Sequence, residues 1–117
     1  MSYDWSKLCQ GFVSVFSKKR QWTVKYIRLG ELHVSHRFHA IAQRKIAHRI
    51  IHLQNYNHYN HPSCLSVSQL RSILPSMTDI QVYVADGAYT VQDGNGRAVA
   101  LASVFPSTFR VEVKLYI

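Results

Sequence analysis

Basic and aromatic side chains alternate in the first half of this chain, and together they are suited to binding nucleic acid. Lysine and arginine neutralise phosphates, whereas the flat rings of tryptophan and tyrosine stack on unpaired bases. The candidate binding residues form a basic run, a β-rich stretch with two aromatics and a basic helical stretch. They are Lys18, Lys19, Arg20, Trp22, Lys25, Tyr26, Arg28, Arg44, Lys45 and Arg49.

The positive charge is confined to one half of the sequence. The 117 residues carry a formal charge of +8, and residues 1–60 hold ten Lys or Arg against Asp4 and Glu31. Residues 61–117 hold four basic and four acidic residues, and all seven histidines lie in the first 61 positions. This asymmetry favours one basic binding surface over charges that only solvate the protein. An acidic protein or an anionic membrane surface remains an alternative target.

A histidine-rich stretch offers a possible metal site. His52, His58, His61 and Cys64 follow one another with the spacing H-x5-H-x2-H-x2-C. Imidazole nitrogen and thiolate sulfur are the usual ligands of Zn²⁺. The paired C-x2-C of structural zinc sites is missing, so we favour an ordinary polar loop and expect no cofactor, with zinc as the alternative.

Cys9 is the candidate nucleophile, because a thiol near the start of a helix can be activated by the helix dipole and a histidine. The string Cys9–Val13 resembles the start of the catalytic helix in NlpC/P60-type peptidases over about five residues. Gln10 stands where that motif carries serine, and residues 79–117 contain no histidine, so no residue role is transferred. Cys9 lies on an apolar stripe and is interpreted as a buried structural thiol. We expect no enzyme activity, with a Cys9-dependent hydrolase as the least favoured alternative.

The glycines of the second half are interpreted as turn residues. Gly87, Gly94 and Gly96 follow aspartate or asparagine between short β-like runs. A phosphate-binding loop needs a helix directly after it. Because we predict a strand after Gly96, these residues are not expected to hold phosphate.

Apolar periodicity predicts the elements that must position these residues. A helix is expected over 4–17, a weak hairpin over 22–34, a second helix over 38–53 and a polar loop over 54–63. A short helix over 67–74 follows, capped by Ser66 with Gln69 in a capping box. From Asp79 onward we predict four strands, the last over 108–117 with unbroken alternation. The predicted fold is α+β, with the helices and the hairpin packed on a four-stranded antiparallel meander in the C-terminal half.

We expect a single domain, 1–117, with a basic helix-rich half (1–60) and a neutral β-meander half (79–117). A hydrophobic content of 47% excludes a disordered polycation. No apolar run reaches about 18 residues and no secretory signal is recognisable, so no membrane span is expected. Two cysteines fit a reducing compartment, which favours a cytoplasmic or nuclear location inside the cell.

The leading hypothesis is a small, basic, non-enzymatic protein that binds RNA or DNA through its backbone. If the strand at 108–117 lies at a sheet edge, it could pair with a second copy to form a homodimer, which we favour; the alternative is a central or covered strand of a monomer. The alternative is a protein-interaction module, such as a viral or phage accessory factor, that binds an acidic partner surface.

Overall fold

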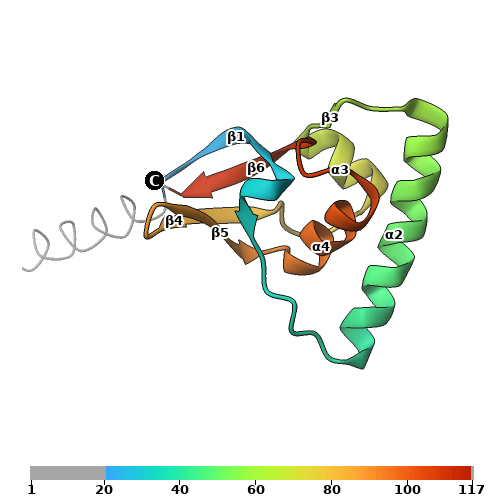
Figure 1. The fold of residues 1–117 in the computed structure, drawn as a ribbon, viewed down its shortest axis with the longest axis horizontal. Helices are drawn as coiled ribbons and strands as arrows, with labels where there is room; N and C mark the ends of the chain where they lie inside the picture. Colours follow the sequence, from blue (N-terminus) through green and yellow to red (C-terminus); the bar gives the residue numbers. More distant parts are fainter. Residues whose placement is uncertain (1–20, 117) are drawn as a thin grey trace, which may run out of the picture.

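The computed structural model describes residues 21–116, which form three α-helices, one 3-10 turn and six strands (Figure 1). The helix predicted over 4–17 lies outside the described residues. In chain order the elements are β1 (Trp22–Arg28), η1 (Leu29–Glu31), β2 (Leu32–His33), α2 (Ala40–Asn60), β3 (Cys64–Leu65), α3 (Val67–Ile73), β4 (Gln81–Ala85), β5 (Ala88–Asp93), α4 (Asn95–Val104) and β6 (Arg110–Tyr116).

The six strands form one mixed sheet, in the order β1-β6-β4-β5-β2, with β3 beside β6. β1 is antiparallel to β6 and β5 to β4, whereas β4 and β3 run parallel to β6 and β2 parallel to β5. The α+β class is therefore confirmed. The predicted four-stranded antiparallel meander is wrong, because strands from both halves of the chain contribute to the sheet and three of its five pairings are parallel.

The main error concerns the strand predicted through Val99 and Phe105, because Asn95–Val104 form the helix α4. The alternate placement of Val99, Leu101 and Phe105 is typical of a strand, which is why a strand is predicted from the sequence. The buried residues of α4 are Arg97, Ala98, Ala100 and Leu101, spaced as one helical face. Alanine is the strongest helix former. Local propensity and packing together thus outweigh a short period-two pattern.

The predicted hairpin over 22–34 is also wrong, because β1 and β2 lie at opposite edges of the sheet. After β1 the chain follows the segment that leads into β6. Leu29 N donates to Phe109 O at 2.9 Å, and Gly30 N donates to Ser107 O at 2.9 Å. A Cβ on Gly30 would lie 3.0 Å from Cβ of Ser107, so glycine permits this close approach. These long-range bonds replace the hairpin turn.

α2 runs to Asn60, although residues 54–63 were expected to be a loop. Leu53 is fully buried and Tyr56 packs against the core one turn later, so burial extends the helix through polar residues. His61 ends it in the left-handed region (φ 45°, ψ 55°), with its N–H on Asn57 O at 2.9 Å. Pro62 then prevents continuation. α3 with its Ser66–Gln69 capping box is confirmed.

The core lies between the sheet and the helices, and Figure 1 shows α4 between the strands and α2. Val111, Val113 and Leu115 of β6 are buried, and Phe105 stacks on Phe109 with ring centroids 4.0 Å apart. β6 confirms the predicted C-terminal strand. It has β1 on one side and β4 and β3 on the other, so it is a central strand, and the free edge that the homodimer hypothesis requires is not present in β6. β6 therefore cannot support the dimer as it was predicted.

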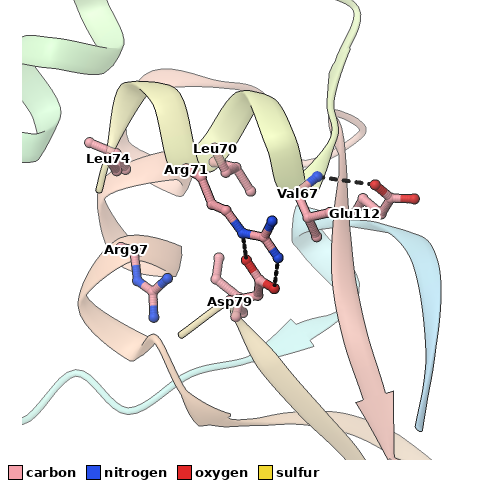
Figure 2. A pocket seen from close by; sticks show the side chains of 8 residues that line it. Val67, Leu70, Arg71, Leu74, Asp79, Arg97 and Glu112 are labelled. Carbon is pink, nitrogen blue, oxygen red and sulfur yellow. Dashed lines mark hydrogen bonds and ion pairs between the residues drawn. The ribbon is translucent and has the colours of Figure 1, made fainter. Parts of the chain in front are cut away.

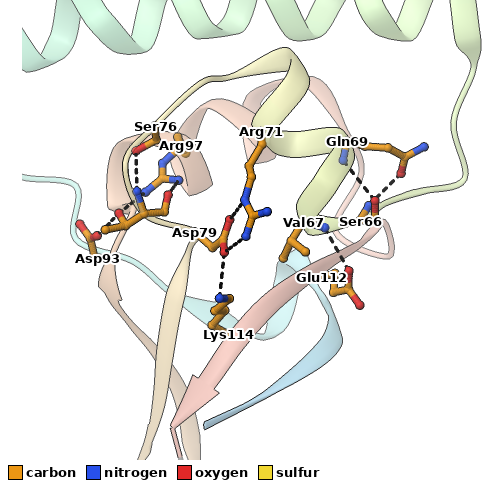
Figure 3. A network of polar contacts seen from close by, with 11 residues as sticks. Ser66, Val67, Gln69, Arg71, Ser76, Asp79, Asp93, Arg97, Glu112 and Lys114 are labelled. Atoms are coloured by element: carbon orange, nitrogen blue, oxygen red, sulfur yellow. Dashed lines mark hydrogen bonds and ion pairs between the residues drawn. The ribbon is translucent and has the colours of Figure 1, made fainter. Parts of the chain in front are cut away.

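A buried carboxylate, Asp79, ties α3 to the sheet (Figure 3). Its Oδ1 accepts from Arg71 Nε at 2.8 Å and its Oδ2 from Arg71 Nη2 at 2.6 Å, while Lys114 Nζ lies 3.2 Å from Oδ2. The bond from Arg71 is the main reason why the pKa of Asp79 lies below its usual value; Lys114 lowers it further, and burial opposes both. Asp79 thus fixes α3 against the start of β4 and the middle of β6.

The substitution Asp79→Asn should destabilise the fold by about 1–3 kcal/mol, the range for a hydrogen bond to a charged group. Because the folded pKa is lowered, the carboxylate stabilises the protein fully above its unfolded pKa of about 3.9. This contribution disappears as the pH falls through the folded pKa. Urea unfolding of both proteins at pH 7 and near pH 3 should therefore show a gap that narrows in acid.

The matched control is Asp86→Asn, in the exposed β4–β5 turn, where the carboxylate forms no ion pair among the described residues. Asparagine tolerates its positive φ of 51°. This variant should stay within about 0.5 kcal/mol of the parent. An equal loss for both variants would contradict the role given to Asp79.

Candidate functional site

A hollow of ≈ 320 Å³ opens at the N-terminal end of α4. Arg49 reaches it from α2 and Arg97 from α4, and the remaining walls come from the end of β5 and the loop before β4. The lining residues are Arg49, Ser76, Thr78, Gln92, Asp93, Gly94, Asn95, Gly96 and Arg97. We call this the α4 hollow. It contains Arg49, one of the candidate nucleic-acid-binding residues, and Arg97, which lies far from Arg49 in the sequence.

Two glycines shape the α4 hollow. Gly94 is the N-cap of α4 and adopts the left-handed region (φ 94°, ψ 22°), which turns the chain from β5 into the helix. Because the N-cap has no side chain, the first N–H groups of α4 receive no side-chain cap from the part of the chain that the structure describes. A Cβ on Gly96 would lie only 2.6 Å from Arg49 Nη1, so this guanidinium rests directly on the first turn. The glycines bring backbone amides and a cation together.

Arg97 brings a buried positive charge to the α4 hollow, since only 7% of it is exposed. Its Nη1 donates to Thr78 O at 2.5 Å and its Nη2 to Thr78 Oγ1 at 3.4 Å. Within residues 21–116 it forms no ion pair with a carboxylate. Figure 2 shows Asp79 joined to Arg71 and not to Arg97. Asp93 instead accepts a hydrogen bond from the Thr78 hydroxyl.

Burial lowers the pKa of Arg97, and repulsion from Arg49 acts in the same direction, whereas Asp93 and Asp79 oppose it. A guanidinium nevertheless remains charged in proteins. A buried charge without a contacting counter-ion is costly. The α4 hollow holds two arginines against one carboxylate, so an anion bound there would supply the missing compensation.

The geometry suits an anion with several oxygens. Helix N-terminal amides and the helix dipole favour phosphate. Guanidinium groups bind phosphate oxygens through paired N–H bonds. The hydroxyls of Ser76 and Thr78 add further polar groups at the wall. The chemical capacity of the α4 hollow is therefore phosphate binding.

Sequence reasoning missed Gly94, Gly96 and Arg97, because it assigned the glycines to turns before a strand. That interpretation is wrong: β5, a glycine-rich turn and α4 form the strand-to-helix transition whose absence was the reason for excluding phosphate. The helical spacing of the apolar residues after Gly94 is the signal that could have identified the transition. The burial of Arg97 has no counterpart in the sequence pattern.

The other candidate residues do not form one surface with Arg49. Arg44 and Lys45 lie exposed on α2 and do not line the α4 hollow. Lys25 on β1 donates to the Tyr89 hydroxyl at 2.7 Å, which is the main reason why its pKa is raised. Trp22, Tyr26 and Arg28 occupy alternate positions of β1, on the opposite face of the strand from Lys25. Lys18, Lys19, Arg20 and Cys9 lie outside the described residues.

The histidines of the proposed zinc spacing are spread over several elements. His52 and His58 lie on α2, His61 is its C-cap, and Cys64 begins β3. Within residues 21–116 no group of three or more His, Cys, Asp or Glu is arranged to hold a metal ion. None of the helices in that range is long and apolar enough to cross a membrane.

Comparison with known proteins identifies no relative. No family model matches the chain, and neither the curated proteins nor the solved structures contain a significant match.

Gly94→Ala should destabilise the fold by about 2 kcal/mol or more, within the range for a strained backbone plus a close contact. The left-handed conformation disfavours a Cβ, and this Cβ would also lie 3.0 Å from Ile80 Cγ1 and 3.2 Å from Ile80 Cα. Gly87→Ala is the matched control, since Gly87 has a φ of 75° but no atom of residues 21–116 lies within 4 Å of its Cβ position. It should cost only about 1–2 kcal/mol. Urea unfolding measures both, and a smaller loss for Gly94→Ala would contradict the tight packing described here.

Proposed function

We propose that this protein binds nucleic acid through its phosphates, and that the α4 hollow is its phosphate anchor. The observation that carries the proposal is Arg97, which is nine-tenths buried without a carboxylate ion pair among the described residues and lies beside Arg49. A phosphate oxygen at the first turn of α4 would meet both guanidinium groups and free backbone amides.

A phosphodiester suits the α4 hollow because its single negative charge is carried by two oxygens. Arginine provides planar pairs of donors that match such a group. The balance of two arginines against Asp93 leaves one positive charge, which one phosphodiester would neutralise. The α4 hollow therefore supports a single phosphate contact within a longer strand.

The positive charge of residues 1–60 supports binding of a nucleic-acid chain rather than of a single phosphate ion. Residues 1–60 carry a formal charge of +8, which would attract a chain of phosphates over a wide area. We assign binding without a chemical step. The proposal covers RNA and DNA alike, because backbone contacts do not read the bases.

Arg49→Gln should weaken binding to a 20-nucleotide RNA or DNA about tenfold, since one charged bidentate contact is lost. It should also reduce the slope of log K against log salt by about one. Fluorescence anisotropy between 50 and 200 mM salt would give both values. Arg37→Gln is the control with the same change in charge, because Arg37 is exposed and does not line the α4 hollow. It should change the affinity less than about twofold.

Equal effects of the two variants would remove the α4 hollow from the proposal and leave only general attraction. An affinity that does not change with salt would contradict phosphate binding altogether. Weak binding to every nucleic acid, together with one tightly bound acidic protein, would instead favour the interaction module.

A further inference from the structure

A second surface combines aromatic and cationic side chains on one face of the sheet. On β6, Val111, Val113 and Leu115 are buried, so the alternate residues face away from the core. Strand register adds their neighbours, because directly paired residues of adjacent strands share a face. We call this the outer face. Its residues are Trp22, Val24, Tyr26 and Arg28 of β1, Arg110, Glu112, Lys114 and Tyr116 of β6, and Gln81 and Tyr83 of β4.

The aromatic rings of the outer face are unusually accessible. Trp22 is 45% exposed, Tyr26 44% and Tyr83 37%. Lys114 Nζ lies 3.6 Å from the centre of the Trp22 ring, and the rings of Trp22 and Tyr116 are 6.4 Å apart. The cation and the neighbouring ring hold the indole in place, although nearly half of its surface is open. The exposed part of the Trp22 ring and the exposed rings of Tyr26 and Tyr83 are therefore accessible to a ligand.

One end of the outer face is hollowed and basic. A cavity of ≈ 520 Å³ is lined by Tyr26, Arg28 and Arg110 together with the short polar side chains of Ser63, Cys64 and Thr108. Arg28 forms an ion pair with Glu31, with 3.4 Å between Nε and Oε1, whereas Arg110 forms no ion pair within residues 21–116. The cavity thus joins a stacking ring to a guanidinium that is free to bind an anion.

We propose that the outer face binds single-stranded nucleic acid by stacking unpaired bases on Trp22 and Tyr26, with a phosphate between Arg28 and Arg110. This inference rests on the proposed nucleic-acid binding and names the kind of strand. In a duplex the bases are stacked on one another, so their flat faces are not available to these rings.

The charge and the spacing favour a nucleic acid over an apolar partner. Three of the outer-face residues are cations: Lys114 is paired with Asp79 and Arg28 with Glu31, whereas Arg110 forms no ion pair within residues 21–116. Val24 is the only aliphatic residue of the outer face, whereas Trp22, Tyr116 and Tyr83 form a row of aromatic side chains across β1, β6 and β4. Trp22 and Tyr26 are four strand residues apart, roughly 13 Å. Sheets with aromatics on one face bind two or three bases in this way.

Trp22 itself can report the contact. The chain has two tryptophans, so Trp5→Phe leaves Trp22 as the only indole. In this background, a 12-nucleotide oligouridine RNA should quench the fluorescence of Trp22 at saturation. A phosphodiester chain of the same length without bases should bind through the α4 hollow and leave the fluorescence unchanged. Quenching by both chains, or by neither, would overturn the inference.

Affinity provides the second measurement. Trp22→Ala and Tyr26→Ala should each weaken binding of the same RNA about tenfold, as expected when one base loses its stack. They should not change binding of the chain without bases. Tyr59→Ala, which removes an 80% exposed tyrosine on α2 outside the outer face, is the control and should stay within twofold.

The variants separate this inference from the proposed function. If Arg49→Gln weakens RNA binding and the two aromatic variants do not, the α4 hollow is retained and the outer face is excluded. If only the aromatic variants weaken binding, the outer face is retained and the α4 hollow is excluded. If Trp22→Ala and Tyr26→Ala lower the unfolding midpoint without changing RNA affinity, another part of the protein covers the outer face and the inference is overturned.

Discussion

The buried strand β6 is the constraint on which the rest of the structure depends. Val111, Val113 and Leu115 are removed from water on one face, and the strand has hydrogen-bonded neighbours on both sides. Its pairing with β1 decides which side chains of β1 reach the outer face. Its pairing with β4 brings Lys114 to Asp79, which also holds α3. A change in the register of β6 by one residue would exchange the two faces of the strand.

Arg97 of α4 is a buried charged residue, although arginine is rarely buried in protein cores. The helix lies between the sheet and α2, so Arg97 in its first turn is buried even though the α4 hollow opens beside it. The carbonyl and hydroxyl oxygens of Thr78 accept hydrogen bonds from the two terminal nitrogens of the Arg97 guanidinium. The charge has no carboxylate ion pair among the described residues, in contrast to the fully compensated Asp79. This difference separates a structural ion pair from a candidate binding group.

Much of the secondary structure could be predicted from short-range signals. The capping box at Ser66 and Gln69, the Asp86-Gly87 turn and the alternation that forms β6 each depend on neighbouring residues, and each is confirmed. The errors occur where distant contacts override local pattern. α2 continues past Leu53 because Tyr56 packs against the core, and β1 leaves its expected hairpin because Leu29 bonds to Phe109.

The sequence by itself determined the α+β class, the strong C-terminal strand, and the excess of positive charge and stacking residues in the first half. Only the tertiary structure decided how these residues are grouped. It set Arg49 beside Arg97, some fifty positions away, and put Trp22, Tyr26 and Arg28 on one face with Arg110. Composition and periodicity describe neighbours along the chain, whereas a binding site is made by strand register and helix packing, which bring distant residues together.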